Sequence, residues 1–333
     1  MVLALLLLLA ASTPFDDAFR AGLIALQNGD FAAARTNLEA AEKLNPKDGR
    51  VWVALSQAHW RLHNTAEAEE AAEKAAALSP EDPAVLQSLA IYYSETGATL
   101  KAAEAAAKYS SKVPSDQPAA DRAAELYFEA SRPLLEQQKF EEAIAILENG
   151  AALLPKSAQL QLALGVADYG LRRFDEAAGA FLRAIEISPD TEQPYSFLAR
   201  MLDQIPARLP EVAKRFVAYE SAHPDNPAVY LWHAKVLNAQ AIQPDEAIRL
   251  LSKSISMKDS DPSAHFELGS VYDRLNRFSD AAAEYERAIA LAPSDPATHY
   301  RLARDYDRLG KPDAAQAERE KHAQLVQARE AVR

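Results

Sequence analysis

Residues 262–295 read PSAHFELGSVYDRLNRFSDAAAEYERAIALAPSD, and this stretch shows the pattern that decides the fold. Two apolar-periodic segments of about a dozen residues each flank a turn at Asn276-Arg277-Phe278. Asp261 directly precedes Pro262, which places a capping side chain before a proline suited to the first helical turn. The stretch therefore predicts a helical hairpin.

The same hairpin pattern recurs along the chain with a period close to 34 residues. The prolines that close successive units are spaced 34, 34, 41, 34, 35 and 69 residues apart, the last gap being two periods. A fixed period of this size is the signature of a repeat architecture. Nine units follow, with residues 117–123 as an insertion: 15–48, 49–82, 83–116, 124–157, 158–191, 192–226, 227–261, 262–295 and 296–329.

Small residues stand at the eighth place of every unit, such as Gly22 and Gly269. An alanine of the second helix faces this place in every unit except the sixth, which has Val212. Two small faces let helix backbones approach closely, and a larger side chain there overpacks the contact by roughly 1–3 kcal/mol. We therefore expect Gly269→Leu to destabilise the array.

The repeat resembles the tetratricopeptide repeat (TPR), whose consensus combines a 34-residue period with Leu-Gly, Tyr, Ala, an aromatic, Ala and Pro. Unit 262–295 carries Leu268-Gly269, Tyr272, Ala281, Tyr285, Ala288 and Pro293 in that order. The resemblance extends from residue 15 to the end of the chain. It implies an all-α, TPR-type α-solenoid, a right-handed superhelix of antiparallel helix hairpins that forms a single domain over residues 13–333.

Two places depart from the regular pattern. Pro114 and Pro118 around the insertion are expected to delay the next helix, so residues 117–123 form either a hinge or a longer loop. In the sixth unit, Pro206 and Pro210 predict a longer turn and a shortened helix.

The N-terminal residues 1–12 are typical of a secretory signal peptide. Val2 to Ala11 is almost wholly apolar, and small residues follow, with cleavage expected near Ala11 or Ser12. Ten residues are too few for a transmembrane anchor. The interpretation predicts an exported protein, periplasmic or secreted. Because no Lys or Arg precedes the run, an apolar cap packed on the first helix pair is the alternative, and it would leave the protein cytoplasmic.

Composition and motifs argue against several functional classes. The chain has no cysteine, and its net charge of -12 opposes wrapping of nucleic acid or of an anionic membrane. No phosphate-loop, zinc-protease, serine-hydrolase or dinucleotide motif occurs. We therefore predict no enzyme activity, no catalytic residue and no cofactor.

Histidines are the remaining candidates for metal ligands. His59 and His63 are four residues apart and could share a helix face as metal ligands. His59, however, occupies a place that holds tyrosine in other units, so we favour packing and expect no metal site. His265 and His299 likewise stand where other units have Trp52 or Tyr195.

A solenoid presents a concave surface lined by its first helices, and this surface is the predicted binding site. We expect a non-catalytic scaffold that binds an extended peptide or partner protein of unknown identity, in envelope assembly or secretion. The alternatives are a self-associating structural scaffold and, remotely, a metal-binding protein or enzyme on His59 and His63. No unit has the Lys and Asn pair with which some TPR domains hold a C-terminal carboxylate. The predicted groove residues are Gln57, Trp60, Arg61, Gln87, Phe128, Arg132, Tyr169, Arg200, Asp203, Lys235, Asn238, Phe266, Asp273, Arg274, Tyr300, Arg304 and Asp307.

Overall fold

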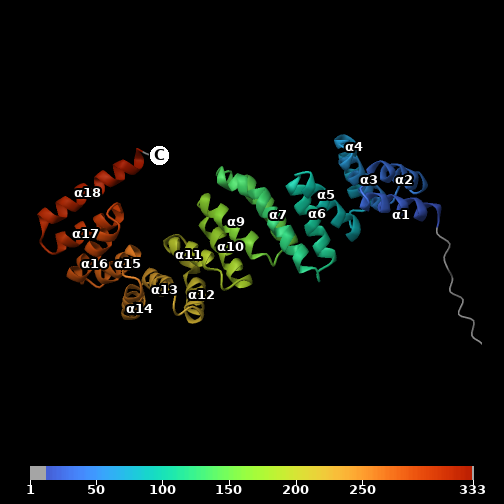
Figure 1. Ribbon diagram of the computed structural model, residues 1–333. Helices are drawn as coiled ribbons and strands as arrows, with labels where there is room; N and C mark the ends of the chain where they lie inside the picture. The colour runs from blue at the N-terminus through green and yellow to red at the C-terminus, as the bar shows by residue number, and fades with distance from the viewer. Residues whose placement is uncertain (1–12, 332–333) are drawn as a thin grey trace, which may run out of the picture. The chain divides into compact units, whose positions relative to one another are not determined.

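The structure is a computed structural model, and it describes residues 13–331. Over this range the chain forms eighteen α-helices and two short 3-10 helices, without a strand (Figure 1). The predicted signal peptide lies outside the described residues. The helices are α1 (Pro14–Gln27), α2 (Phe31–Leu44), α3 (Gly49–Arg61), α4 (Thr65–Leu78), α5 (Pro83–Glu95), α6 (Thr99–Lys112), α7 (Gln117–Glu136), α8 (Phe140–Leu153), α9 (Ala158–Gly170), α10 (Phe174–Ile187), α11 (Glu192–Arg200), η1 (Leu202–Gln204), η2 (Pro206–Arg208), α12 (Leu209–Ala222), α13 (Pro227–Ala239), α14 (Pro244–Met257), α15 (Pro262–Arg274), α16 (Phe278–Leu291), α17 (Pro296–Arg308) and α18 (Pro312–Glu330).

The helices divide into two compact units, with the boundary in the turn between α9 and α10. We call them the N-terminal unit, which holds α1 to α9, and the C-terminal unit, which holds α10 to α18. That residues 13–333 form one domain therefore stays a prediction.

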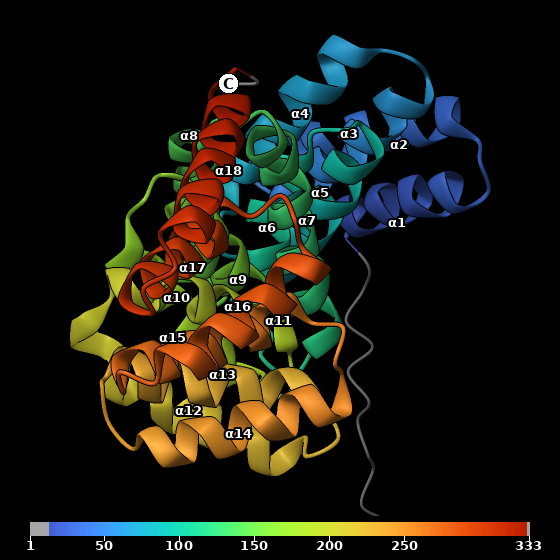
Figure 2. The same ribbon diagram turned by 90° about the vertical axis from the view of Figure 1, so that its left-hand side faces the viewer.

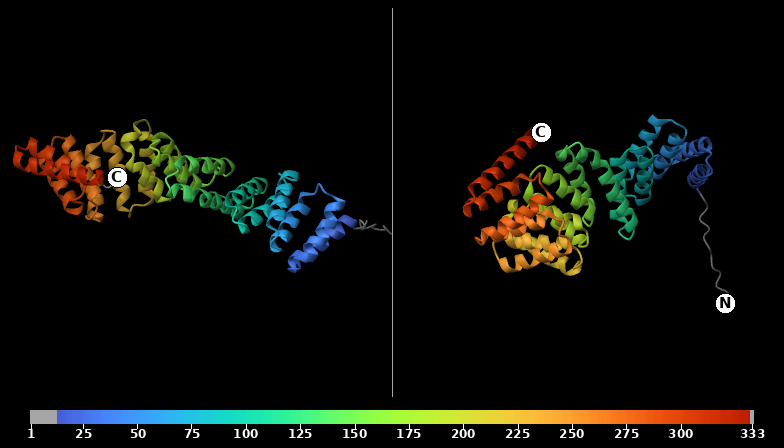
Figure 3. Two further views of the ribbon diagram at one scale, coloured as in Figure 1. Left: turned by 90° about the horizontal axis from the view of Figure 1, so that it is seen from above. Right: turned by 60° about the vertical axis from the view of Figure 1, so that its left-hand side comes forward.

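Inside each unit, successive helices pair as hairpins. Helix α1 packs on α2, α3 on α4, α13 on α14 and α15 on α16. Figure 2 shows the last two pairs lying side by side in the C-terminal unit, and Figure 3 shows the helices of each unit from two further directions. The prediction of an all-α chain of helical hairpins is confirmed.

Capping side chains begin the first helix of most repeats where the sequence predicts. Thr13 forms a capping box with Asp16 at the start of α1. Asp82, Asp261 and Asp295 each accept hydrogen bonds from backbone amides in the first turn of the following helix. Each is followed by proline, which needs no hydrogen bond there.

The turn inside almost every repeat places one residue in the left-handed region, and the turn of the seventh repeat places two, Ala241 and Gln243. Only the sixth repeat, whose turn consists of η1 and η2, has no such residue among those described. Glycine adopts this conformation without strain, whereas a side chain with a Cβ pays for it with about 1–2 kcal/mol. The residues, with φ between 47° and 77°, are Gly29, His63, Gly97, Gln138, Arg172, Ala241, Gln243, Asn276 and Gly310.

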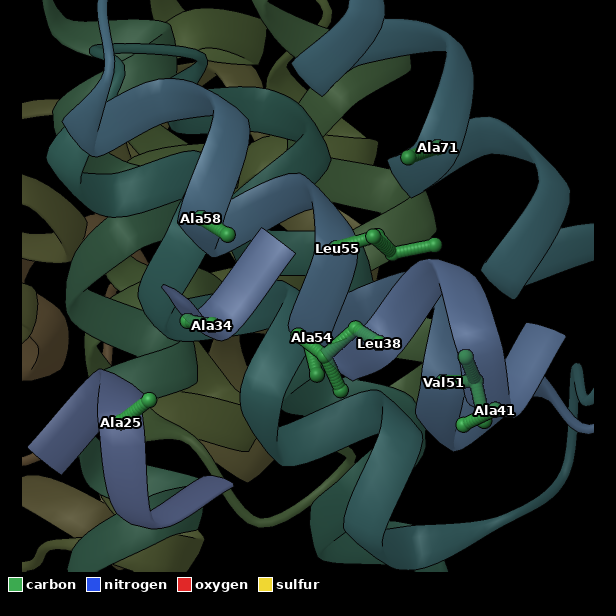
Figure 4. Packing of buried hydrophobic residues seen from close by; sticks show 9 residues of the cluster. All are labelled: Ala25, Ala34, Leu38, Ala41, Val51, Ala54, Leu55, Ala58 and Ala71. Carbon is green, nitrogen blue, oxygen red and sulfur yellow. The ribbon is translucent and has the colours of Figure 1, made fainter. Parts of the chain in front are cut away.

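The predicted small-residue contacts form the core. The facing residue of the second helix, an alanine or Val212, has 0% exposure in all nine repeats. A Cβ on Gly269 would lie 2.8 Å from Cε1 of Tyr285, so the glycine makes room for the ring. Figure 4 shows the corresponding core of the first repeats, where Leu38 and Ala34 of α2 join Ala54 and Leu55 of α3.

The insertion does not delay a helix, which corrects that prediction. Residues 117–123 are helical and open α7, which runs for 20 residues. Asp116 caps the helix by accepting from the amide of Ala119, and Pro118 stands in the first turn, where its missing amide hydrogen costs nothing. The insertion is therefore neither a hinge nor a loop.

The sixth repeat follows its prediction. Helix α11 is only nine residues long, and η1 and η2 fill the turn before α12. Pro206 begins η2 and Pro210 lies in the first turn of α12. Both prolines thus stand where the chain starts a new helical segment.

Between residues 13 and 331, no helix combines the length and the apolar composition needed to cross a membrane. Residues 2–11, which we predict to be too few to span a membrane, lie outside the described residues.

Candidate functional site

A pocket of about 660 Å³ lies on the C-terminal unit, and only first helices and the segments that follow them line it. Helices α11, α13, α15 and α17 come from four consecutive repeats, and η1 and Asn276 complete the lining. Second helices are absent from it. We call this site the basic groove; its residues are Ala199, Arg200, Leu202, Asp203, Lys235, Asn238, Ala239, Phe266, Glu267, Ser270, Asp273, Arg274, Asn276, Arg301, Arg304 and Arg308.

Helical periodicity explains why these side chains share one surface. On α15, Glu267, Ser270 and Arg274 are spaced by three and four residues, which places them on one helix face. Arg301, Arg304 and Arg308 repeat this spacing on α17. The opposite faces carry the buried contacts with the second helices, so the groove face is free for a ligand.

Many of the predicted residues of the C-terminal unit line the groove together. Tyr300 does not line it, but its ring lies under the guanidinium of Arg304, 5.9 Å from centroid to Cζ. Asp307 pairs instead with Arg319 of α18, at 2.7 Å between the Oδ2 and Nη1 atoms. The predicted residues that line the groove are Arg200, Asp203, Lys235, Asn238, Phe266, Asp273, Arg274 and Arg304.

Three of the predicted groove residues of the N-terminal unit contact other side chains of that unit. The rings of Trp60 and Tyr92 meet edge to face at 6.5 Å, and Arg61 pairs with Glu95 at 2.8 Å. Arg132 lies 3.9 Å from Glu136 one helical turn on. The remaining candidates stand on first helices α3, α5, α7 and α9: Gln57, Gln87, Phe128 and Tyr169.

Sequence reasoning missed the sixth place of the repeat. Glu267 and Arg301 occupy this place in their units, and both line the groove. The second, sixth, ninth and thirteenth places are spaced by four, three and four residues, so they form one helical stripe. Applying this spacing to the first helices would have found both residues.

The groove carries a surplus of positive charge. Six cationic and three acidic side chains line it, in a chain whose net charge is -12. Two of the cations, Arg301 and Arg308, pair with Asp273. Within the described residues the other four have no ion pair: Arg200, Lys235, Arg274 and Arg304.

Burial perturbs one carboxyl close to the lining residue Arg308. Asp305 of α17 is fully buried, and the lining residue Arg308 donates a hydrogen bond to its Oδ1 at 3.1 Å. Burial, together with the nearby Asp273 carboxylate, raises the pKa of Asp305 to about 6. Arg308 therefore holds two neighbouring carboxyls from adjacent repeats.

Glu267 lies in the floor of the groove, where 9% of the residue is exposed. Its Oε1 accepts a hydrogen bond of 2.6 Å from Nδ2 of Asn238, on the neighbouring helix α13. Burial raises the pKa of Glu267, which favours the neutral carboxyl. This carboxyl thus contributes less negative charge to the groove than an exposed glutamate would.

Two further features complete the lining. Phe266 packs against Tyr285 with ring centroids 5.7 Å apart, which fixes an apolar wall. Nε and Nη2 of Arg274 are buried and have no hydrogen-bond partner among the described residues. Buried guanidinium nitrogens normally have partners, so this arginine has donor capacity to spare.

Sequence profiles of tetratricopeptide repeats match residues 19–83, 134–201 and 239–296, together more than half of the chain. The chain belongs to the tetratricopeptide repeat family. Among curated proteins, no sequence matches this TPR chain significantly.

Solved structures share the TPR fold at low sequence identity. PilW, described as a widely conserved type IV pilus biogenesis factor, is 20% identical, with 61% of this chain and 91% of PilW covered at a TM-score of 0.50. PilF of Pseudomonas aeruginosa is 17% identical, with coverage of 60% and 90% and a TM-score of 0.46. Yeast Tom70 is 15% identical, with coverage of 93% and 92% and a TM-score of 0.42.

Two histidines of this TPR chain, His265 and His299, have packing partners within their repeats. His299 Nε2 lies 3.0 Å from the carbonyl of Pro293, six residues earlier. In the same place of other repeats, Trp52 and Tyr195 donate to the carbonyls of Pro46 and Pro189, both at 2.8 Å. His265 follows the pattern toward the carbonyl of Asp259. The interpretation of His265 and His299 as repeat-packing residues is confirmed.

The pair proposed as metal ligands is not on one helix face. His59 belongs to α3, but His63 lies in the following turn with φ of 62°. His59 Nδ1 instead faces the side-chain amide of Asn64 at 3.4 Å. Over residues 13–331, no three His, Cys, Asp or Glu side chains are arranged to hold a metal ion.

Proposed function

We propose that this TPR protein is a non-catalytic scaffold that binds an extended segment of a partner protein in the basic groove. The observation that carries the proposal is the continuity of the groove across four consecutive first helices. Neighbouring helices lie about 8–10 Å apart, so three steps span roughly 24–30 Å. An extended chain rises about 3.3 Å per residue, so about seven to nine residues fill this length.

Two of the three carboxyls that line the groove, Asp273 and Glu267, support recognition rather than proton transfer. Asp273 is engaged by Arg301 and Arg308, and Glu267 by Asn238. A general base needs an accessible lone pair directed at its substrate. Carboxyls held by neighbouring repeats fix the arrangement of the cationic side chains instead.

We place the scaffold in the cell envelope, in assembly or secretion. The support is the signal-like composition of residues 2–12, together with a fold shared with PilW, which is itself described as a pilus biogenesis factor. Export predicts that the mature chain begins close to Thr13, the N-cap of α1.

A photoreactive amino acid at Ser270 in the groove tests the proposal. The matched control carries the same group at Ser252, which is exposed on the second helix α14. We expect a discrete partner to be cross-linked from position 270 in the envelope fraction and not from position 252. Equal cross-linking from both positions would contradict a groove-binding scaffold.

A further inference from the structure

We propose that the segment held in the basic groove is acidic, with carboxylates spaced three residues apart along an extended chain. The inference rests on the proposed function, and it names the chemistry of the partner that this groove fits. Three observations carry it: cations that form no ion pair among the described residues, their spacing by one repeat, and the weakened negative charge of two of the three carboxyls that line the groove.

The first observation is that four cationic side chains of the groove form no ion pair between residues 13 and 331. Arg200, Lys235, Arg274 and Arg304 form no ion pair within the described residues, although other surface cations of the same unit do. Two guanidinium nitrogens of Arg274 are also buried without a hydrogen-bond partner. A ligand carboxylate would supply the acceptor that a guanidinium fork matches in geometry.

The second observation is the spacing. Arg200, Lys235 and Arg304 all occupy the ninth place of their repeats, so each points from the same face of its first helix. One repeat step of about 8–10 Å matches one turn of a chain in the extended polyproline II conformation, which has three residues per turn at about 3.1 Å each, so every third side chain faces the groove. Ser270 holds the ninth place between Lys235 and Arg304, and Arg274, one helical turn further on the same face, supplies the cation of that repeat.

The third observation is that the groove's acidic side chains oppose an acidic ligand only weakly. Arg301 and Arg308 neutralise Asp273, and burial favours the uncharged form of Glu267. Asp203, beside Arg200 on η1, is the remaining carboxylate of the lining. The field along α13, α15 and α17 is therefore positive where the ligand would lie.

A peptide fits this groove better than a nucleic acid does. Single-stranded nucleic acids bind where successive bases stack on exposed aromatic rings. Phe266 is the one aromatic side chain of the lining, and it packs against Tyr285. Asn238, Ser270 and Asn276 add the amide and hydroxyl groups that hydrogen-bond a peptide backbone.

The test measures fluorescence anisotropy of labelled decapeptides with the full chain. The first peptide carries Glu at positions 1, 4, 7 and 10 with Ala and Ser between them. The second has the same composition with its four glutamates adjacent, the third replaces Glu by Lys, and the fourth by Gln. We expect the first peptide to bind on the order of 10-fold more tightly than the second, with an affinity that falls as salt rises.

Charge reversal locates the binding site. The variant R200E/K235E/R304E is expected to lower the affinity for the first peptide on the order of 100-fold. The control K214E/K258E/K321E makes the same change in net charge at exposed positions outside the lining, and it should bind within a factor of about three of the parent. If the reversed variant does not fold by circular dichroism, R200Q/K235Q/R304Q takes its place.

Several outcomes would overturn the inference. Equal affinities for the spaced and clustered peptides would reject the spacing, and equal binding of the Gln peptide would reject the acidic character. Tighter binding of a ten-uridine oligonucleotide, lost in R200E/K235E/R304E, would assign the groove to nucleic acid. If the spaced peptide does not bind while Ser270 still cross-links a partner, the scaffold stands and the acidic segment is rejected; if both fail, both proposals fall.

Discussion

Arg308 of α17 donates hydrogen bonds to Asp273 of α15, one repeat earlier, and to Asp305 of its own helix. One guanidinium thus ties two repeats together at the edge of the groove. Both carboxyls are buried, with 9% and 0% of the residue exposed. Leaving a buried carboxylate without its cation is among the more destabilising changes in a protein.

We therefore expect Arg308→Met to lower the free energy of unfolding by about 2–4 kcal/mol. The control is Arg287→Met, because Arg287 pairs with Asp259 where both side chains are about half exposed. Such a surface pair contributes about 0–1 kcal/mol. Urea unfolding measures the free energy of unfolding of both variants. Equal decreases in the two variants would show that the ion pairs of Arg308 stabilise the fold no more than an exposed pair does.

Asp305 gives the stability a defined pH dependence. Its pKa of about 6 in the folded state exceeds the ordinary value of 3.8, so the native state favours the protonated carboxyl. The contribution is fully present below about pH 4 and is lost as pH rises through 6, where ionisation in a buried site costs about 2–3 kcal/mol. We expect Asp305→Asn to match the parent near pH 4 and to melt at a higher temperature at pH 8. A difference in melting temperature that does not change with pH would contradict this prediction.

Gly269 offers a direct test of the repeat packing. A Cβ there would come within 2.8–2.9 Å of the Tyr285 ring, so we expect Gly269→Leu to lower stability by roughly 1–3 kcal/mol and Gly269→Ala by less. Gly179 of α10 is the control, because its nearest contacts would be at 3.5 Å or more. Gly179→Ala should raise stability by about 0.5–1 kcal/mol through helix propensity. Thermal melts that show no loss for Gly269→Leu would contradict the close contact.

His299 should be replaceable by the residue that other repeats use. Its ring nitrogens face Glu318 Oε2 at 2.5 Å and the Pro293 carbonyl at 3.0 Å, and both partners are acceptors. Tyr195 and Tyr230 donate to the corresponding carbonyl in their repeats, and the Tyr230 hydroxyl also accepts a hydrogen bond from Lys253. We expect His299→Tyr to cost under about 1 kcal/mol and His299→Phe about 1–2 kcal/mol, because Phe leaves the Pro293 carbonyl without its side-chain donor. Equal unfolding midpoints for the two variants would show that the hydrogen bond to the Pro293 carbonyl does not stabilise the fold.

Local rules of helix formation allowed most of the fold to be predicted from the sequence. Asp261-Pro262 and Asp295-Pro296 define helix starts through one side chain and one fixed φ angle, without help from distant residues. The insertion was predicted wrongly because Pro118 can either interrupt a helix or stand in its first turn. Asp116 decides between the two by capping α7, and this choice depends on the packing of the whole helix.

The candidate site was predictable only in part. Repeat register identified Arg200, Lys235 and Arg304 as outward-facing residues, but it could not show which cations find acidic partners. Ion pairs such as Arg308 with Asp273 join residues 35 positions apart in the sequence. Such pairs depend on side-chain length and on the approach of neighbouring helices, which the register alone does not determine.

The turns inside the repeats have a consequence for the thermal stability of the protein. His63, Gln138 and Asn276 hold φ values of 58–62°, whereas Gly29, Gly97 and Gly310 take the same role with glycine. Glycine at the three strained sites would relieve more backbone strain than it adds in chain entropy, a net gain of about 0.5–1 kcal/mol each. Asn276 lines the groove, whereas His63 and Gln138 do not, so glycine at the latter two turns would raise heat tolerance without altering the ligand-binding surface.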